Sequence, residues 1–236
     1  RKEFVKEALK NNIPAIITNK ILKFVNIPQF LVFDLESETE ILLKNLFKYY
    51  HRNTIAVTGT NGKTSVVWYL SQILNFLKHS NSFVGTLGYF KNGNKINETN
   101  LTTPAYEELY KYGSSNRKFN NTFIFEASSH AIDQNRIRNY PINIAAITNI
   151  SIDHLDYHKN FKNYKQAKLN LFNNHLKNNG YAIINSRLKN ISSFIKKLKS
   201  RKIKIIIYGK KNVYFVKKNE NLKLQIKKNS YNINKI

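Results

Sequence analysis

Residues 55–64 combine a glycine turn with a lysine and a threonine, in the order Ile-Ala-Val-Thr-Gly-Thr-Asn-Gly-Lys-Thr. A short apolar run enters this turn, and a segment with apolar residues at helical spacing leaves it. Glycines let backbone N–H groups approach phosphate oxygens, and the start of a helix adds partial positive charge. Lys63 can then reach the outer phosphates of a nucleotide, and the Thr64 hydroxyl can bind Mg²⁺. The stretch predicts a phosphate-binding loop formed by Gly59, Thr60, Asn61, Gly62, Lys63 and Thr64.

The match to the P-loop pattern is imperfect, because Val57 stands where that pattern has its first glycine. The alternative is a chance glycine turn. The strand pattern before the turn and the helix pattern after it argue against that alternative.

A second candidate site follows the apolar run at 123–125, where Glu126 is succeeded by Ala-Ser-Ser-His. A carboxylate at the end of such a strand lies at the edge of the sheet where α/β proteins collect ligands. Beside a triphosphate, one carboxylate is a natural Mg²⁺ ligand. A protease-like Ser/His pair is the alternative, and the missing G-x-S-x-G turn argues against it.

A third candidate site, at 148–158, reads Thr-Asn-Ile-Ser-Ile-Asp-His-Leu-Asp-Tyr-His and again follows an apolar run. Two carboxylates and two imidazoles within a few residues suggest metal chemistry. Because imidazole suits zinc or manganese better than magnesium, the residues alone favour one of those metals.

Two further candidates, the Thr102–Thr103 pair and Lys168, can be interpreted as functional or as structural from the residues alone. The hydroxyls of Thr102 and Thr103, before Pro104 at a helix start, can bind a pyrophosphate or a carboxylate, but an ordinary threonine N-cap explains them at least as well. Lys168 lies on a predicted helix, where a solvated lysine is the simplest interpretation.

The elements that must position these residues alternate between strand and helix. Strands are expected at 82–87, 122–126, 143–148, 181–184 and 203–208, and helices at 64–78, 105–112, 160–177 and 188–200. Helix-length spacers between buried-type strands predict an α/β fold, with a P-loop-containing, mostly parallel sheet covered by helices on both faces.

The two ends of the chain are predicted separately. Residues 1–35 have one helical pattern and two short strands, too little to close a domain alone, and a capping box at 37–40 predicts the start of a linker helix within 36–52. Residues 53–236 would form the main domain, with a hairpin near 213–226.

The composition of the chain excludes several kinds of site and of protein. The 236 residues contain no cysteine, which excludes disulfides, thiolate zinc sites and a cysteine nucleophile. No apolar run reaches the roughly 18–20 residues of a membrane span, and no signal peptide is evident, so a cytoplasmic protein without membrane attachment is expected. Because the chain begins with Arg1 and lacks methionine, it is expected to be a fragment.

The net charge of +25 suggests a basic nucleic-acid-binding NTPase as an alternative of a different class. The lysines are spread over the whole chain together with many Asn and Ile residues, which is typical of compositional drift in an AT-rich genome. We therefore expect no specific nucleic-acid partner, only weak, salt-sensitive binding to polyanions.

Four blocks, in order, resemble the Mur ligase family of ATP-dependent amide-bond ligases. They are T-G-T-N-G-K-T at 58–64, E-A-S-S-H-A-I-D-Q-N-R at 126–136, T-N-I-S-I-D-H-L-D-Y-H at 148–158 and Y-K-Q-A-K-L-N-L-F at 164–172. The second block is similar to the type of Mur ligase that uses a UDP-muramoyl-dipeptide. Residues 1–33 resemble the back half of the family's uridine-binding domain, and the family's C-terminal domain would be absent.

The resemblance implies a role for each block. It implies ATP with two Mg²⁺ ions, the first on Thr64 and Glu126 and the second on Glu126, His154 and a carbamylated Lys168, with Asn149 and Asp153 near the nucleotide. Lys63, His154 and Lys168 would be catalytic. The implied substrate contacts are Thr102, Thr103, Ser128, Gln134 and Arg136.

The implied reaction adds the third amino acid, by preference meso-diaminopimelate, to UDP-N-acetylmuramoyl-L-alanyl-D-glutamate through an acyl phosphate, during peptidoglycan synthesis. A monomer is expected, which folds but does not ligate alone. Another Mur ligase or a folylpolyglutamate synthase-like ligase is the alternative of the same class, although Thr64 replaces the glycine usual in folylpolyglutamate synthases. An inactive remnant is a further alternative. Ala131 departs from the glycine common in the family at that position.

Overall fold

The computed structural model describes residues 2–47, 51–114 and 122–209, and the backbone of 213–218, 221–226 and 229–233. The chain divides into two compact units, Arg1–Lys48 and Tyr49–Ile236. None of the helices in the described part of the chain has the length and apolar character needed to span a lipid bilayer.

The first unit contains helix α1 (Lys2–Lys10), strands β1 (Ile16–Thr18) and β2 (Gln29–Leu31), and helix α2 (Leu35–Leu46). The two strands pair in parallel. The predicted capping box at 37–40 is wrong, because Asp34 caps α2 and accepts hydrogen bonds from the amides of Glu36 and Ser37. Residues 48–50 of the predicted linker helix lie outside the described residues.

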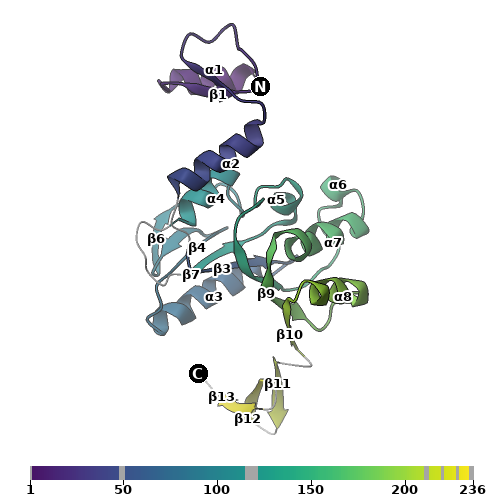
Figure 1. Ribbon diagram of the computed structural model, residues 1–236. Coiled ribbons are helices and arrows are strands. Elements are labelled where there is room, and N and C mark those ends of the chain that lie inside the picture. The colour runs from purple at the N-terminus through teal and green to yellow at the C-terminus, as the bar shows by residue number, and fades with distance from the viewer. Residues whose placement is uncertain are drawn as a thin grey trace. The chain divides into compact units, whose positions relative to one another are not determined.

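The second unit is built on a sheet of eleven strands among the residues described, in the order β13-β12-β11-β10-β9-β8-β3-β7-β4-β5-β6 (Figure 1). The six central strands run parallel to one another. They are β3 (Asn53–Thr58), β4 (Asn81–Gly85), β7 (Thr122–Glu126), β8 (Ile142–Ile147), β9 (Leu176–Asn185) and β10 (Lys204–Tyr208). The predicted α/β fold with a mostly parallel sheet is therefore confirmed.

The strands at either end of this sheet pair in antiparallel fashion. They are β5 (Gly88–Lys91) and β6 (Asn94–Asn97) at one end, and β11 (Val213–Lys218), β12 (Asn221–Ile226) and β13 (Asn229–Ile233) at the other. The predicted C-terminal hairpin is present as β11 and β12, although residues 219 and 220 of its turn lie outside the described residues.

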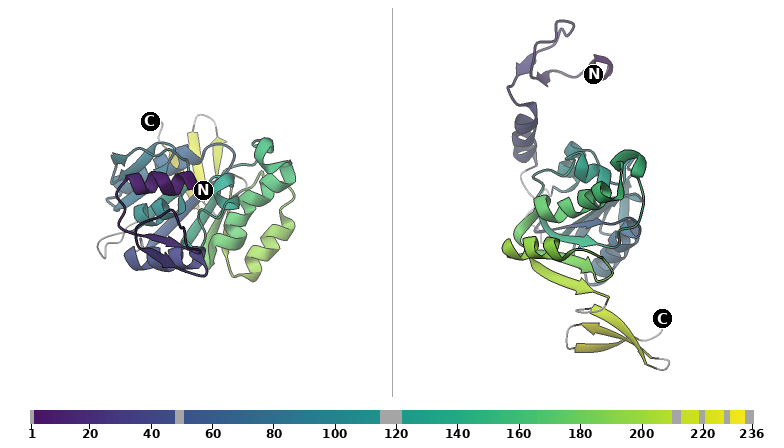
Figure 2. Two further views of the ribbon diagram at one scale, coloured as in Figure 1. Left: turned by 90° about the horizontal axis from the view of Figure 1, so that it is seen from above. Right: turned by 90° about the vertical axis from the view of Figure 1, so that its right-hand side faces the viewer.

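Helices cover both faces of the parallel strands, because the chain extends the sheet in both directions from β3 and right-handed crossovers in opposite directions place their helices on opposite faces. Helix α3 (Lys63–Phe76) contacts β3, β4 and β7, and Figure 2 shows it on the opposite side of the sheet from α7 (Phe161–Asn170) and α8 (Ser192–Ser200). The remaining helices are α4 (Tyr106–Tyr112), α5 (Ser129–Asp133), α6 (Leu155–His158) and the π-helical turn η1 (Leu171–His175), which continues α7. The predicted helix at 160–177 is thus an α-helix followed by a π turn.

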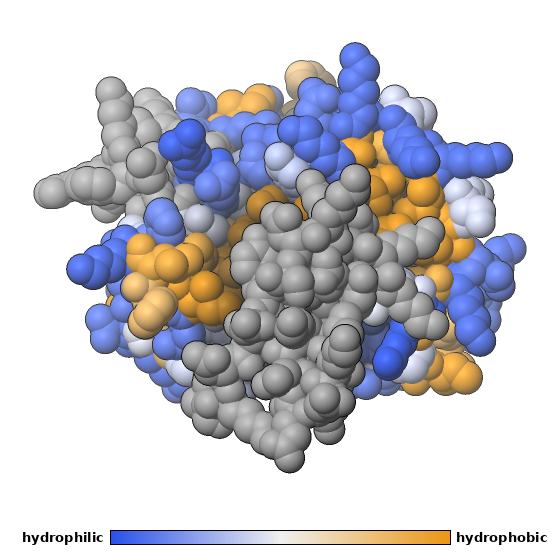
Figure 3. Space-filling model, turned by 90° about the horizontal axis from the view of Figure 1, so that it is seen from below, coloured by the Kyte–Doolittle hydropathy of each residue, from blue (hydrophilic) through white to orange (hydrophobic). Residues whose placement is uncertain are grey.

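Helix α3 is apolar on both of its sides. Its inner side packs Val67 into a core cluster with Val57, Phe83, Phe90 and Ile124. Its outer side leaves apolar side chains exposed, among them Tyr69, Ile73 and Phe76. Figure 3 shows hydrophobic areas among hydrophilic ones on the face of the molecule seen from below.

Candidate nucleotide-binding and active site

The glycine turn joins the end of β3 to the start of α3, as the sequence predicts. Gly62 precedes α3 with a φ of 82°, and no side chain caps the helix there. Gly59 has a φ of 149°, and a Cβ added to it would lie 1.8 Å from the Thr148 hydroxyl oxygen. Both positions therefore need glycine, and the N–H groups at the helix start are free of side-chain caps.

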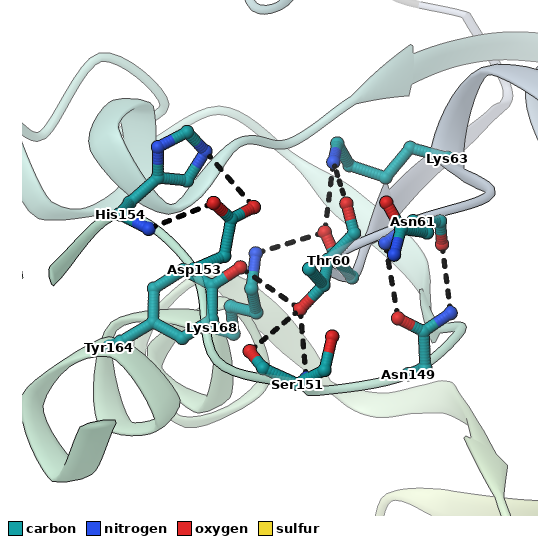
Figure 4. Close-up of polar contacts among 10 residues, drawn as sticks. Thr60, Asn61, Lys63, Asn149, Ser151, Asp153, His154, Tyr164 and Lys168 are labelled. Atoms are coloured by element: carbon teal, nitrogen blue, oxygen red, sulfur yellow. Dashed lines mark hydrogen bonds and ion pairs between the residues drawn. The ribbon is translucent and has the colours of Figure 1, made fainter.

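The loop after β8 holds the glycine turn in place (Figure 4). The Asn149 side chain accepts from the Asn61 amide at 3.1 Å and donates to the Asn61 carbonyl at 3.0 Å. The Asn149 carbonyl accepts from the Thr60 amide at 3.0 Å. The Thr148 hydroxyl donates to the same Asn61 carbonyl at 2.6 Å. Asn149 was predicted to lie near the nucleotide, and its described contacts are with the backbone of the glycine turn, which they shape.

Lys63 lies over the turn. Its Nζ donates to the carbonyls of Gly59 at 2.9 Å and Thr60 at 3.0 Å (Figure 4). Partial burial lowers the pKa of Lys63, while Glu126 and Asp153 oppose this shift. The ammonium group is thus positioned beside the cradle in which phosphates would bind.

Glu126 ends β7 and is buried, with 1% of its surface exposed. Its carboxylate accepts from the Thr64 hydroxyl at 2.9 Å and from the Thr86 amide at 2.8 Å. Burial raises the pKa of Glu126, and the hydrogen bonds and Lys63 oppose the shift. A Cβ at position 85 would lie 2.1 Å from the carboxylate, so Gly85 makes room for it. A buried carboxylate paired with a hydroxyl is an all-oxygen donor set that fits Mg²⁺.

Lys168 points from α7 into the protein and is 1% exposed, so the solvated-lysine interpretation is wrong. Its Nζ donates to the Gly59 carbonyl at 2.9 Å and lies 4.5 Å from the centre of the Tyr164 ring. Burial, assisted by the positive charge of Lys63, lowers the pKa of Lys168 to about 7. A substantial share of this side chain is therefore a neutral amine at physiological pH.

His154 has a left-handed backbone conformation, with a φ of 50°, and its ring lies near that of Tyr164. Its Nε2 is 3.5 Å from the Asp153 carboxylate (Figure 4). Its ring stands edge-on to that of His130, with centroids 4.8 Å apart, and is tilted against that of Tyr164 at 6.2 Å. The other imidazole of the block, His158, is buried against Tyr164. Across the residues that the structure describes, no three His, Asp or Glu side chains gather as a metal site. The zinc or manganese cluster that bare chemistry favoured at 153–158 is therefore not formed.

Four of the five predicted substrate residues form one network at the ends of β4 and β7. The buried Thr103 hydroxyl donates to the Glu126 carbonyl at 2.8 Å and accepts from the Ser128 amide at 2.9 Å. Arg136 donates to the Thr103 carbonyl at 2.7 Å, and the Thr102 hydroxyl accepts from that of Thr86 at 3.2 Å. The threonine N-cap interpretation is wrong, because Ala105 occupies the N-cap of α4.

The remaining residues show what the sequence left unspecified. Gln134 is exposed at the end of α5, and Ser128 caps the start of that helix. Tyr164, not predicted as a site residue, is fully buried and places its hydroxyl 3.0 Å from that of Thr60. Its position one helical turn before Lys168 was the available signal.

Comparison with known proteins identifies the family. Residues 57–236 match the Mur ligase middle domain. The chain is 36% identical over 241 residues to the UDP-N-acetylmuramoyl-L-alanyl-D-glutamate--2,6-diaminopimelate ligase of Rickettsia montanensis, covering 98% of this chain and 50% of that protein. It is 36% identical over 240 residues to the ligase of the same name from Wigglesworthia glossinidia brevipalpis, covering 96% of this chain and 46% of that protein. The chain spans about half the length of these curated relatives.

Solved structures of Mur ligases are similar in fold over almost the whole chain. A UDP-N-acetylmuramoyl-L-alanyl-D-glutamate--2,6-diaminopimelate ligase superposes with a TM-score of 0.75 at 25% identity, covering 98% of this chain and 49% of the other. A MurF ligase from Thermotoga maritima in complex with ADP gives a TM-score of 0.63 at 16% identity, covering 98% of this chain and 51% of the other, and shows the fold alone. From the family match and these relatives, the chain belongs to the Mur ligase family and carries its middle domain.

Proposed function

We propose that this chain is the ATP-binding part of a ligase that joins 2,6-diaminopimelate to UDP-N-acetylmuramoyl-L-alanyl-D-glutamate. The observation that carries the proposal is the convergence of Lys63, the Thr64–Glu126 pair and Lys168 on one glycine turn. The curated relatives with this reaction in their names supply the substrates.

In this proposal ATP binds with its phosphates in the glycine turn. The backbone of the turn and the start of α3 would bind phosphate oxygens, and Lys63 would leave the Gly59 and Thr60 carbonyls to pair with them. Thr64 and Glu126 would hold one Mg²⁺, which when bound neutralises charge on the phosphates. Two solved structures with a similar fold support this choice of ligands. One is the MurF ligase in complex with ADP, and the other is a bifunctional folylpolyglutamate synthase/dihydrofolate synthase with Mn and AMPPNP bound.

The reaction would proceed in two steps. The substrate carboxylate takes the γ-phosphoryl group from ATP, which gives an acyl phosphate and ADP, and the amine of the incoming amino acid then displaces phosphate. Phosphoryl transfer depends mainly on positioning and charge stabilisation. Lys63 supplies positive charge for it, and Glu126 and Thr64 remain fixed by their mutual hydrogen bond.

Lys168 would act as a carbamate. A neutral amine adds to CO₂ and releases one proton, giving an anionic carbamate. The lowered pKa and burial of Lys168 favour this addition. The carbamate would give up the bond to the Gly59 carbonyl and, with His154 and Glu126, hold a second Mg²⁺.

The muramoyl-dipeptide would bind beside the Thr103 network. Arg136 Nε is buried without a hydrogen-bond partner in the described structure, which suits a carboxylate ligand.

We assign residues 1–35 to the uridine-binding part, 36–52 to a linker and 53–236 to the ATP-binding part. We further propose that the protein is a cytoplasmic monomer.

Calorimetric titration of the purified chain tests the proposal. Mg-ATP should bind the wild-type chain and bind Lys63→Ala much more weakly, and UDP-N-acetylmuramoyl-L-alanyl-D-glutamate should bind while a folate should not. Preference for a folate would favour the folylpolyglutamate synthase alternative. Tight polynucleotide binding that survives about 0.2 M salt would favour the nucleic-acid-binding NTPase instead.

A further inference from the structure

The Thr148 carbonyl is held by two side chains outside the predicted site. Asn185 Nδ2 donates to it at 2.6 Å, and the Tyr208 hydroxyl lies 3.1 Å from the same oxygen and 3.3 Å from the Ile147 carbonyl. A carbonyl oxygen has two lone pairs and can accept from both groups, and the single Tyr208 hydroxyl hydrogen is shared with the Ile147 carbonyl. Asn185 and Tyr208 are paired residues at the carboxyl ends of β9 and β10.

The opposite side of Thr148 faces the glycine turn. Its hydroxyl donates to the Asn61 carbonyl, and its amide donates to the Thr58 carbonyl at 3.0 Å. The same hydroxyl lies where a side chain on Gly59 would be. Thr148 therefore connects the ends of β9 and β10 to the backbone that would bind phosphate.

Thr148 also sets the position of its neighbour Asn149. That residue accepts the amide hydrogens of Thr60 and Asn61. If the Thr148 carbonyl were released, rotation of the peptide bond that it shares with Asn149 would loosen both contacts.

We propose that Asn185 and Tyr208 are positioning residues for the phosphate-binding turn and act through Thr148. They touch neither the turn nor its lysines in the described contacts, and their effect passes through one carbonyl and one hydroxyl. The part of this inference that concerns ATP rests on the proposed function, whereas the part that concerns the turn does not.

The test compares Tyr208→Phe, which removes one hydroxyl, with Tyr181→Phe. Tyr181 lies in the middle of β9, paired with Lys204 at the start of β10, and its hydroxyl accepts from Lys204 Nζ at 3.3 Å on the surface. Hydrogen exchange of a peptide covering 57–64 should quicken in Tyr208→Phe and in Asn185→Leu but not in Tyr181→Phe. This readout needs no nucleotide.

Mg-ATP titration supplies the second readout. Tyr208→Phe should weaken binding about three- to tenfold, as expected for one lost hydrogen bond. In a Thr148→Val background the same change should have a smaller effect, because only the path through the Thr148–Asn149 peptide remains, while in Thr148→Ser, which keeps the hydroxyl, it should persist in full.

Unchanged exchange in both Tyr208→Phe and Asn185→Leu overturns the inference. So does an effect of Tyr208→Phe on ATP binding that is equal in the Thr148→Val and Thr148→Ser backgrounds. If the wild-type chain fails to bind Mg-ATP while the exchange rates respond as expected, the proposed function fails and the positioning of the turn stands.

Discussion

The ammonium group of Lys168 lies over the face of the Tyr164 ring, 4.5 Å from its centre, inside the protein. This contact replaces part of the hydration that the charge loses on burial. It does not replace all of it, because the pKa of Lys168 still falls to about 7.

The first prediction concerns the pH dependence that this buried lysine causes. Between pH 7 and the unfolded-state pKa near 10.5, the unfolded chain binds more protons at this position than the folded one. Stability relative to Lys168→Met should therefore rise with pH in this window, by at most about 1.4 kcal/mol per pH unit. Urea unfolding in CO₂-free buffer measures it. Lys162→Met, on the exposed side of the same helix, is the matched control.

The second prediction concerns His51, which is buried between the Gly113 carbonyl, at 2.9 Å, and the Ser82 hydroxyl, at 3.2 Å. Burial lowers the pKa of His51 below its usual 6.5. Below pH 6.5 the unfolded chain therefore takes up a proton before the folded chain does, and stability falls. Unfolding followed from pH 8 to 5 should show a smaller loss in His51→Gln than in the wild type. An equal loss in both, or the same flattening in exposed His79→Gln, would contradict this.

The third prediction compares two glycines of the turn. Gly62→Ala meets only a methyl group at 3.9 Å, so its cost is backbone strain of about 1 kcal/mol. Gly59→Ala adds a collision with the Thr148 hydroxyl, so it should destabilise the fold by about 1–3 kcal/mol more. Chemical unfolding of the two variants gives the difference. Equal stabilities would show that Thr148 moves aside without cost.

The fourth prediction concerns Glu126→Gln, which keeps the shape of the side chain and removes its charge. In the absence of Mg²⁺ this variant should be as stable as the wild type or more stable, because burial disfavours the carboxylate. With Mg²⁺ present, ATP binding should weaken by more than about tenfold. Titration with and without Mg²⁺ separates the two effects. An unchanged dependence on Mg²⁺ would remove Glu126 from the proposed metal site.

The parallel strands and the glycine turn were predictable because their signals are local: apolar runs of strand length and glycines before an amphipathic segment. The hairpin of β5 and β6 was missed, although Asn92-Gly93, with φ angles of 49° and 85°, is a strong turn signal. The start of α2 was misplaced because Ser37 resembles a cap, whereas in the fold its hydroxyl donates to the true cap, Asp34, at 2.6 Å.

The environment of each site residue was less accessible to sequence reasoning. Lys168 resembles a surface lysine in composition, and its burial arises only when α7 packs beside the glycine turn, more than one hundred residues away in sequence. Thr103 was predicted as a substrate contact, and in the structure its hydroxyl donates to the Glu126 carbonyl and accepts from the Ser128 amide. Such contacts depend on which strand ends become neighbours, which no local pattern encodes.

Lys63 and Lys168 both donate to the carbonyl of Gly59. These two amino groups have already shed part of their water during folding. An anion that enters the turn therefore meets hydrogen-bond donors whose dehydration cost was largely met when the chain folded. When the anion binds, each lysine nitrogen only exchanges the Gly59 carbonyl oxygen for an oxygen of the anion. Much of the preference for an anion over water is therefore already present in the free protein.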